Sequence, residues 1–280
     1  MDRDDFLRSL FDTSGRLLEI GPGYHPLLPK ARFPRVETAD YTDAAGLRAK
    51  YATAANVDPA AIEEVDHVLG ADGLAATIAA PDLTRAGRFD AIVASHVIEH
   101  TPDLLGFLKD CETLLAPRGV LVLAVPDKRH CFDVFQPLSS TGAVLQAHFD
   151  RRTRPALGTV FDDRAYNAVR DGAIGWAPGA KGALRFFLDL PGALAAFAAD
   201  RANDAYIDVH VWKFVPSSFR LIVHDLHALG AIALREARFF DSVGNEFYMT
   251  LSRDGAGSDV DRLTLARRML REQAEIDVGR

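Results

Sequence analysis

Short apolar runs alternate with helix-like stretches in the first half of this chain, and that alternation constrains the fold more than any other feature. Apolar runs that stop at glycine, proline or a polar turn are typical of buried strands. A chain that alternates strand and helix in this way forms a parallel sheet with helices on both faces. The sequence therefore predicts an α/β, doubly wound sheet. The expected strands are residues 16–20, 36–40, 65–69, 89–95 and 120–125.

The alternation stops after residue 127 and returns near residue 209. Residues 128–208 are rich in alanine and phenylalanine and predict an inserted, mainly helical lid. The helix before this insertion is expected to begin with Thr101 as its cap, and the helix after it with a serine of the pair at 217–218. We expect four parts. They are an α/β core at 1–127, the lid at 128–208, the end of the core sheet at 209–252 with an antiparallel hairpin, and a helical tail at 253–280.

The first strand ends in a glycine turn, and the second ends in a carboxylate. Gly21, Pro22 and Gly23 follow the first strand, and Asp40 closes the second. In a doubly wound sheet the ligand lies over the carboxyl ends of the strands, where glycines allow close approach and an acid accepts ribose hydroxyls. The pattern predicts a nucleoside-bearing ligand. A glycine-rich turn without a ligand is the structural alternative.

Two neighbours of this turn indicate which nucleoside binds. Another class of protein with such a turn is the dehydrogenases, which bind a dinucleotide. Pro26 stands where the dinucleotide-binding fingerprint has its third glycine, which argues against this alternative. Glu19 would repel phosphates and suits a ligand with an ammonium group. S-adenosylmethionine carries an ammonium and a sulfonium, so it is the cofactor that we expect.

These motifs together resemble the class I S-adenosylmethionine-dependent methyltransferases. The stretches that carry the resemblance are the first motif at 18–23, the acid Asp40, the fourth-strand motif at 89–100, the turn at 115–122 with Arg118 in place of a glycine, and the hairpin around 244–248. The resemblance covers residues 15–127 and 210–252. It implies a seven-stranded Rossmann-like sheet and transfer of a methyl group to an O or N atom of a small-molecule acceptor, with S-adenosylhomocysteine as the product. More narrowly, residues 125–129 and 212–216 resemble a group of bacterial methyltransferase-domain proteins.

The resemblance also implies a set of cofactor contacts. Gly21 and Gly23 would contact the methionine end, Glu19 its amino group and Asp40 the ribose. Asp72 is the expected adenine contact, with a solvated loop aspartate as the alternative. The full set is Glu19, Gly21, Pro22, Gly23, Asp40, Tyr41, Asp72, Ser95 and His96, and for His96 a buried structural histidine is the alternative.

Three histidines are candidates for removing a proton from the acceptor. His100 follows the fourth strand beside the expected crevice, whereas His130 and His210 lie at the edges of the insertion. Histidine titrates near neutral pH, which suits a general base. A surface or capping histidine is the alternative for each. A protein of this fold that binds the cofactor without methylating remains the rival function.

Residues 96–100 also read His-x-x-Glu-His, the inverted zinc-protease motif. That motif needs a helix, and these residues stand between a strand and a helix start, so we do not expect a metalloprotease. Some ubiquinone-pathway O-methyltransferases resemble this stretch and hold a divalent metal there, but His96 replaces their first acidic ligand. The sequence therefore assigns no metal ligand, and the need for a divalent metal at His96, Glu99 and His100 stays open.

Composition restricts the partners and the compartment. The net charge is −7 without a basic stripe, which argues against nucleic acid as a partner. The two cysteines, Cys111 and Cys131, are too few for a disulfide scaffold. The acidic start of the chain and the absence of an apolar run of about 18 residues predict a cytoplasmic protein without membrane insertion. Whether it forms a homodimer stays open.

Overall fold

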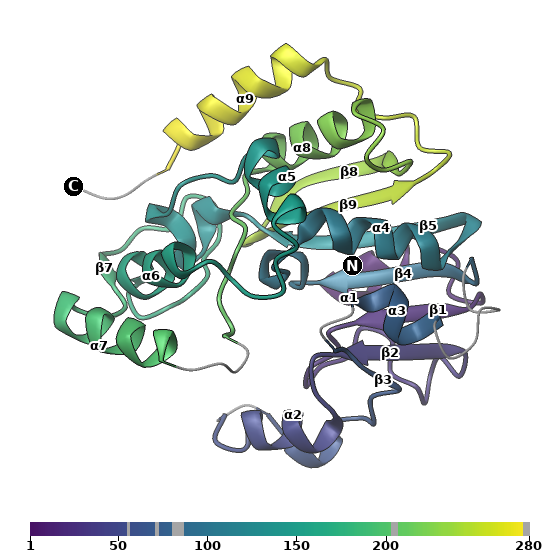
Figure 1. Ribbon diagram of the computed structural model, residues 1–280, viewed down its shortest axis with the longest axis horizontal. Helices are drawn as coiled ribbons and strands as arrows, with labels where there is room; N and C mark the ends of the chain where they lie inside the picture. The colour runs from purple at the N-terminus through teal and green to yellow at the C-terminus, as the bar shows by residue number, and fades with distance from the viewer. Residues whose placement is uncertain (55–56, 71–72, 80–86, 203–206, 277–280) are drawn as a thin grey trace.

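A seven-stranded sheet forms the centre of the computed structural model, which describes residues 1–54, 57–70, 73–79, 87–202 and 207–276 (Figure 1). The strand order is β3-β2-β1-β4-β5-β9-β8. The strands are β1 (Leu17–Ile20), β2 (Val36–Asp40), β3 (His67–Val68), β4 (Phe89–Ser95), β5 (Leu115–Pro126), β8 (Arg235–Val243) and β9 (Glu246–Ser252). β1 to β5 pair in parallel, and β9 is antiparallel to both of its neighbours. The predicted doubly wound, seven-stranded sheet and its reversed hairpin are confirmed.

The two faces of the sheet are covered differently. Apolar side chains of α3 (Leu74–Ala79), α4 (Leu104–Leu114), α5 (Thr141–Phe149) and α8 (Pro216–Ala228) join one face in a single buried cluster. The other face packs against α1 (Arg3–Arg8) and the connection at 21–35, which runs in turns rather than in a helix. The connection between β1 and β2 is therefore an irregular segment that buries Leu27, Leu28 and Phe33.

Two predicted helix caps are wrong. α4 begins at Leu104, because the Asp103 side chain accepts a hydrogen bond from the Gly106 N–H at 2.8 Å. Thr101 instead closes the 3-10 helix η3 (Ile98–His100). α8 begins after Val215, and Ser218 accepts a hydrogen bond from the Val215 N–H at 3.0 Å from inside the first turn.

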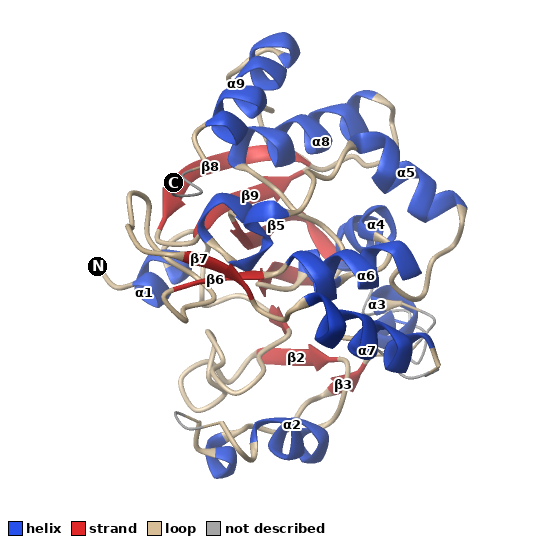
Figure 2. Ribbon diagram, turned by 90° about the vertical axis from the view of Figure 1, so that its left-hand side faces the viewer, coloured by secondary structure: helices blue, strands red, loops and turns tan. Residues whose placement is uncertain are grey.

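The insertion contains a small sheet that the sequence analysis did not predict. Its helices are α5, α6 (Leu157–Tyr166) and α7 (Leu190–Arg201), and between the last two lie β6 (Ala168–Arg170) and β7 (Leu184–Phe186). β6 and β7 pair with each other and not with the main sheet (Figure 2). Three residues per strand are too few to show an alternation. In Figure 1, α6, α7 and β7 lie on the side to which the parallel strands point.

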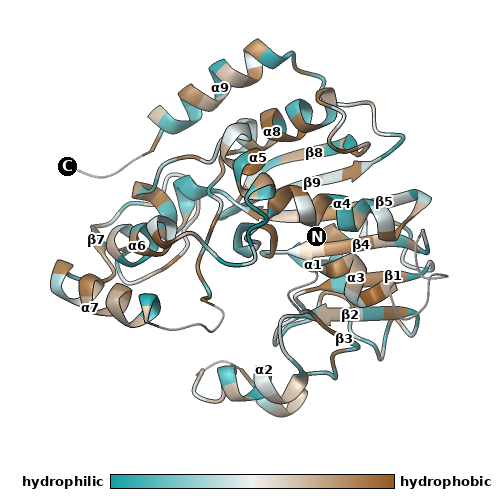
Figure 3. Ribbon diagram, in the orientation of Figure 1, coloured by the Kyte–Doolittle hydropathy of each residue, from teal (hydrophilic) through white to brown (hydrophobic). Residues whose placement is uncertain are grey.

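Five further elements complete the described part of the chain. They are α2 (Ala44–Tyr51), the 3-10 helices η1 (Pro59–Ala61), η4 (Lys128–His130) and η5 (Phe132–Phe135), and α9 (Arg262–Ala274). α9 mixes hydrophilic and hydrophobic residues along its length (Figure 3), and Leu265 is its buried residue. Within the described ranges, no helix combines the length and the apolar character needed to cross a bilayer.

Candidate functional site

A cavity of about 680 Å³ opens at the carboxyl ends of β1, β2 and β4. Parallel strands place their carboxyl ends on one edge, which is where doubly wound sheets bind ligands. The predicted site residues that line this cavity are Gly21, Gly23, Asp40, Tyr41, His96 and His100. The structure therefore brings together residues from three separate stretches of the chain.

The turn after β1 needs its two glycines. Gly21 and Gly23 have φ angles of +69° and +55°, in a region of backbone conformation that residues other than glycine rarely adopt. A Cβ atom on Gly21 would lie 2.7 Å from a methyl carbon of Val97. The bare backbone thus forms part of the cavity wall, and a ligand can approach it closely.

Asp40 presents a buried carboxylate at the cavity. Its oxygens accept hydrogen bonds from the N–H of Tyr41 at 2.7 Å and of Gly23 at 3.3 Å, which ties the end of β2 to the glycine turn. Burial raises the pKa of Asp40, and these two backbone donors oppose the shift. Asp40 is 5% exposed and lines the cavity, which is the position needed to accept hydrogen bonds from ligand hydroxyl groups.

Glu19 has a different position from the one expected for a ligand contact. Its carboxylate accepts hydrogen bonds from the N–H of Leu27 at 2.6 Å and of Leu28 at 2.8 Å. Burial raises the pKa of Glu19 to about 7 despite these donors. Neither Glu19 nor Pro22 is among the described residues that line the cavity. Glu19 holds the 21–35 connection against the sheet, and its contact with a ligand stays a prediction.

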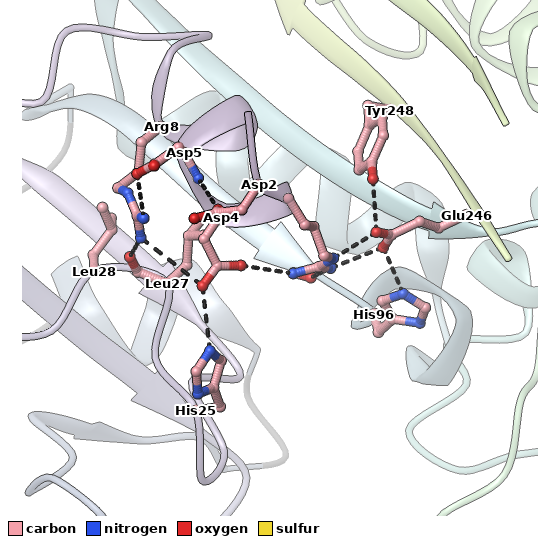
Figure 4. A network of polar contacts seen from close by, with 12 residues as sticks. Asp2, Asp4, Asp5, Arg8, His25, Leu27, Leu28, His96, Glu246 and Tyr248 are labelled. Atoms are coloured by element: carbon pink, nitrogen blue, oxygen red, sulfur yellow. Dashed lines mark hydrogen bonds and ion pairs between the residues drawn. The ribbon is translucent and has the colours of Figure 1, made fainter. Parts of the chain in front are cut away.

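Ser95 and His96 belong to a network that closes the end of β4. Nε2 of His96 lies 2.8 Å from the Glu246 carboxylate, which also accepts hydrogen bonds from Tyr248 and Arg3 at 2.8 Å each (Figure 4). Arg3 donates to the Ser95 hydroxyl at 2.6 Å, and Ser95 is not among the described lining residues. Burial opposes ionisation of Glu246, but the His96 and Arg3 contacts outweigh it and lower its pKa to about 2.

His100 and His210 lie side by side, although 110 positions separate them in the sequence. Their ring centroids are 4.7 Å apart with the planes nearly perpendicular, at 89°. Nδ1 of His100 lies 2.9 Å from the Asp208 carboxylate, and Nδ1 of His210 lies 2.6 Å from that of Asp133. Burial disfavours the charged form of His100, yet Asp208 and Glu99 outweigh it and raise its pKa. Each imidazole therefore has its Nδ1 beside a carboxylate.

Main-chain hydrogen bonds bring this pair together. The carbonyl of Glu99 accepts from the N–H of Val211 at 2.6 Å and of Trp212 at 3.1 Å. The indole of Trp212 donates to the carbonyl of Thr101 at 2.6 Å. The segment after the insertion is thereby fastened to the loop after β4, and His210 is placed beside His100.

Two predicted site residues do not join this group. His130 ends η4, and it is not among the described residues around the cavity. Burial lowers its pKa. Asp72 lies outside the described residues, so the expected adenine contact stays a prediction.

Sequence reasoning missed several partners of the site. Asp133 and Asp208 lie in the insertion, and Glu246 follows the hairpin turn of β8 and β9. Arg3 reaches Glu246 across 243 positions. No local spacing connects these residues with the motifs after β1 and β4. Proximity in the sequence is the one signal that could have suggested a carboxylate partner for a histidine. It would have paired Asp208 with His210, whereas in the structure Asp208 lies beside His100.

Comparisons with known proteins agree with this picture. A family described as "Methyltransferase domain" matches residues 3–171. A ubiquinone biosynthesis O-methyltransferase of Parvibaculum lavamentivorans is 36% identical over 83 residues, which are 28% of this chain and 32% of that protein. The match thus spans about a third of the curated relative.

Two solved structures are also similar to this chain at low sequence identity. The trans-methyltransferase CalH in complex with SAH is 23% identical over 44% of this chain and 35% of that chain, with a TM-score of 0.29. An S-adenosylmethionine-dependent methyltransferase from Mesorhizobium loti is 12% identical over 88% of this chain and 95% of that chain, with a TM-score of 0.44. Because the family match covers more than half of the sequence, this chain belongs to the methyltransferase-domain family, and the resemblance read from its motifs is confirmed.

Proposed function

We propose that this chain transfers a methyl group from S-adenosylmethionine to an O or N atom of a small-molecule acceptor. One observation carries the proposal. The glycine turn, the buried carboxylate of Asp40 and His100, whose ring lies against that of His210, line the same cavity. A nucleoside-binding wall and a proton-accepting wall thus border the same space.

The residues present fit the cofactor. A cavity of about 680 Å³ lies within the range of roughly 300–1,000 Å³ that is usual for small-molecule sites. Gly21 and Gly23 present bare backbone to the cavity, and Asp40 offers an acceptor for ribose hydroxyls. The cofactor, when bound, supplies a methyl carbon activated by the sulfonium.

The protein's part in such a transfer is alignment, exclusion of water and removal of a proton from the acceptor. His100 is one of the titratable groups that line the cavity, and its ring lies against that of His210. We assign acceptor activation to this pair. The acceptor's lone pair then bonds to the methyl carbon as the carbon–sulfur bond breaks, and the electrons of that bond stay on sulfur.

Calorimetric titration of S-adenosylmethionine and S-adenosylhomocysteine tests the cofactor. We expect both to bind the wild type and Asp40→Ala to bind them about 10- to 100-fold more weakly, because a charged hydrogen-bond acceptor is lost. Asp254→Ala removes an exposed carboxylate beyond the end of β9 and serves as the matched control. Failure of well-folded wild type to bind either compound would overturn the proposal.

The acceptor is then sought by a product assay. Candidate phenols, catechols and amines are added with the cofactor, and release of S-adenosylhomocysteine is measured. His100→Ala should retain cofactor binding and lose most of the turnover. Equal turnover in His100→Ala and wild type would contradict the role of this histidine.

A further inference from the structure

The Glu99 carboxylate is completely buried, and neither of its oxygens has a hydrogen-bond partner in the described part of the chain. A buried carboxylate without donors is costly, so such groups pair with cations or bind metals. Around Oε1 of Glu99 lie three imidazole nitrogens. They are Nδ1 of His96 at 3.5 Å, Nε2 of His100 at 3.9 Å and Nε2 of His210 at 3.9 Å.

Two of these imidazoles are oriented as metal ligands are. Asp208 and Asp133 lie against the Nδ1 atoms of His100 and His210, so each Nε2 faces Glu99. A ligating histidine almost always donates its other ring N–H to a carboxylate or carbonyl, which fixes the tautomer and leaves a lone pair for the metal. His96 has the ring nitrogens exchanged, because its Nε2 lies on Glu246 and its Nδ1 faces Glu99, but it is not part of the group whose ligand atoms all lie within 4.8 Å of one another.

We propose that Glu99, His100 and His210 form a binding site for a divalent transition-metal ion. One ligand atom from each residue lies within 4.8 Å of the other two. Metal bonds of about 2.0–2.2 Å require ligand atoms roughly 3–4 Å apart, so small side-chain rotations complete the site. Two imidazoles and one carboxylate suit zinc, iron, cobalt or manganese better than magnesium, which prefers oxygen ligands.

The site deepens the proposed function, and its catalytic part rests on that function. His100 lines the cavity, whereas Glu99 and His210 are buried and are not among the described lining residues. A divalent ion held there would supply a Lewis acid for an acceptor atom in the cavity and would lower the pKa of an acceptor hydroxyl, whose proton would pass to water. The pair of histidines would thus activate the acceptor through the ion rather than as a free base.

Metal binding is measured on the full chain after treatment with a chelator and dialysis. Zn²⁺, Mn²⁺ and Mg²⁺ are titrated separately by calorimetry, and bound metal is counted by elemental analysis. We expect one Zn²⁺ per chain, with Mg²⁺ binding at least tenfold more weakly. Co²⁺ should give the visible absorption bands of an ion held by histidine nitrogen.

Variants locate the ion. His210→Ala and Glu99→Gln should abolish binding, and Asp133→Asn should weaken it about 10- to 100-fold, as loss of an outer carboxylate typically does. His25→Ala is the matched control, because its imidazole is 73% exposed and distant in sequence from the cluster. Circular dichroism and calorimetry with S-adenosylmethionine report whether each variant is folded.

Every outcome decides the inference. Wild type that binds S-adenosylmethionine but neither Zn²⁺ nor Co²⁺ overturns it, and so does unchanged Zn²⁺ affinity in His210→Ala. If the two ligand variants do not fold, Asp133→Asn and the Co²⁺ spectrum decide, and unchanged affinity together with no histidine bands overturns the site. Metal that binds and is lost in the variants supports the site, even where S-adenosylmethionine fails to bind and the proposed function falls.

Discussion

Glu19 and Glu246 are both buried carboxylates beside the site, yet their pKa values move in opposite directions. Glu19 receives only backbone N–H donors, and burial raises its pKa to about 7. Glu246 meets the ring of His96 and the guanidinium of Arg3, which lower its pKa to about 2 against the effect of burial. A charged partner thus offsets desolvation where two neutral donors do not.

The shift of Glu246 predicts acid sensitivity. Its folded pKa lies below the ordinary 4.5, so its contribution to the free energy of unfolding is complete above pH 4.5 and is lost as pH falls toward 2. A shift of this size corresponds to about 3 kcal/mol at most. Glu246→Gln should therefore show a flatter dependence of stability on pH between 5 and 2, measured by urea unfolding.

An exposed glutamate provides the control for this prediction. The Glu64 side chain is 77% exposed and pairs with Arg48. Glu64→Gln should follow the wild-type curve, because exposed ion pairs contribute little. Parallel curves for wild type and Glu246→Gln would show that the network of Figure 4 does not set the acid response.

At the scale of elements, the strands of the core could be predicted and the helix starts could not. Residues 89–95 are predicted and observed as a strand. A strand of a parallel sheet is buried on both faces, so a short, mainly apolar run is its typical sequence pattern. Thr101 and Asp103 both have capping side chains two positions apart, and only the fold decides between them. Partners such as Asp133 come from distant elements, so local pattern could predict His100 and His210 but not their carboxylates.

The observed cap of α4 gives a prediction at this scale. Asp103→Ala should lower the free energy of unfolding by about 1 kcal/mol, because the Gly106 N–H loses its acceptor. The same change removes the partner of His148, whose Nδ1 lies 2.8 Å from the carboxylate. Chemical denaturation of Asp103→Ala and of Thr101→Ala measures the free energy of unfolding of each variant. A larger loss for Thr101→Ala would contradict the observed helix start.

On the scale of the whole molecule, the tail helix α9 provides a hydrogen-bond acceptor for the N-terminus of α8. Val215 precedes α8 without a capping side chain, and the Glu272 carboxylate accepts hydrogen bonds from the Ser217 N–H at 2.9 Å and hydroxyl at 2.5 Å. A carboxylate at a helix N-terminus is favourable. The tail is therefore joined to the core by a specific polar contact.

Loss of that contact should loosen the tail. Glu272→Ala is expected to reduce amide hydrogen-exchange protection in α9 and to lower stability by about 1 kcal/mol. Glu275→Ala is the comparison, because Glu275 lies three residues after Glu272 and contacts Arg129 at 3.1 Å. It should have a smaller effect on both measurements, since the Glu275 side chain is 66% exposed. Unchanged exchange in Glu272→Ala would show that α9 is held by its apolar residues alone.

The contact between Arg3 and Glu246 has a consequence for biosynthesis. Because these residues are 243 positions apart, the first helix leaves the ribosome long before its carboxylate partner exists. β9 must also enter the sheet between β5 and β8 before Glu246 reaches Arg3 and His96. The glycine turn and Asp40 can be in place early in translation, whereas the His96 wall of the cavity gains its final partner only when the last strand has been made.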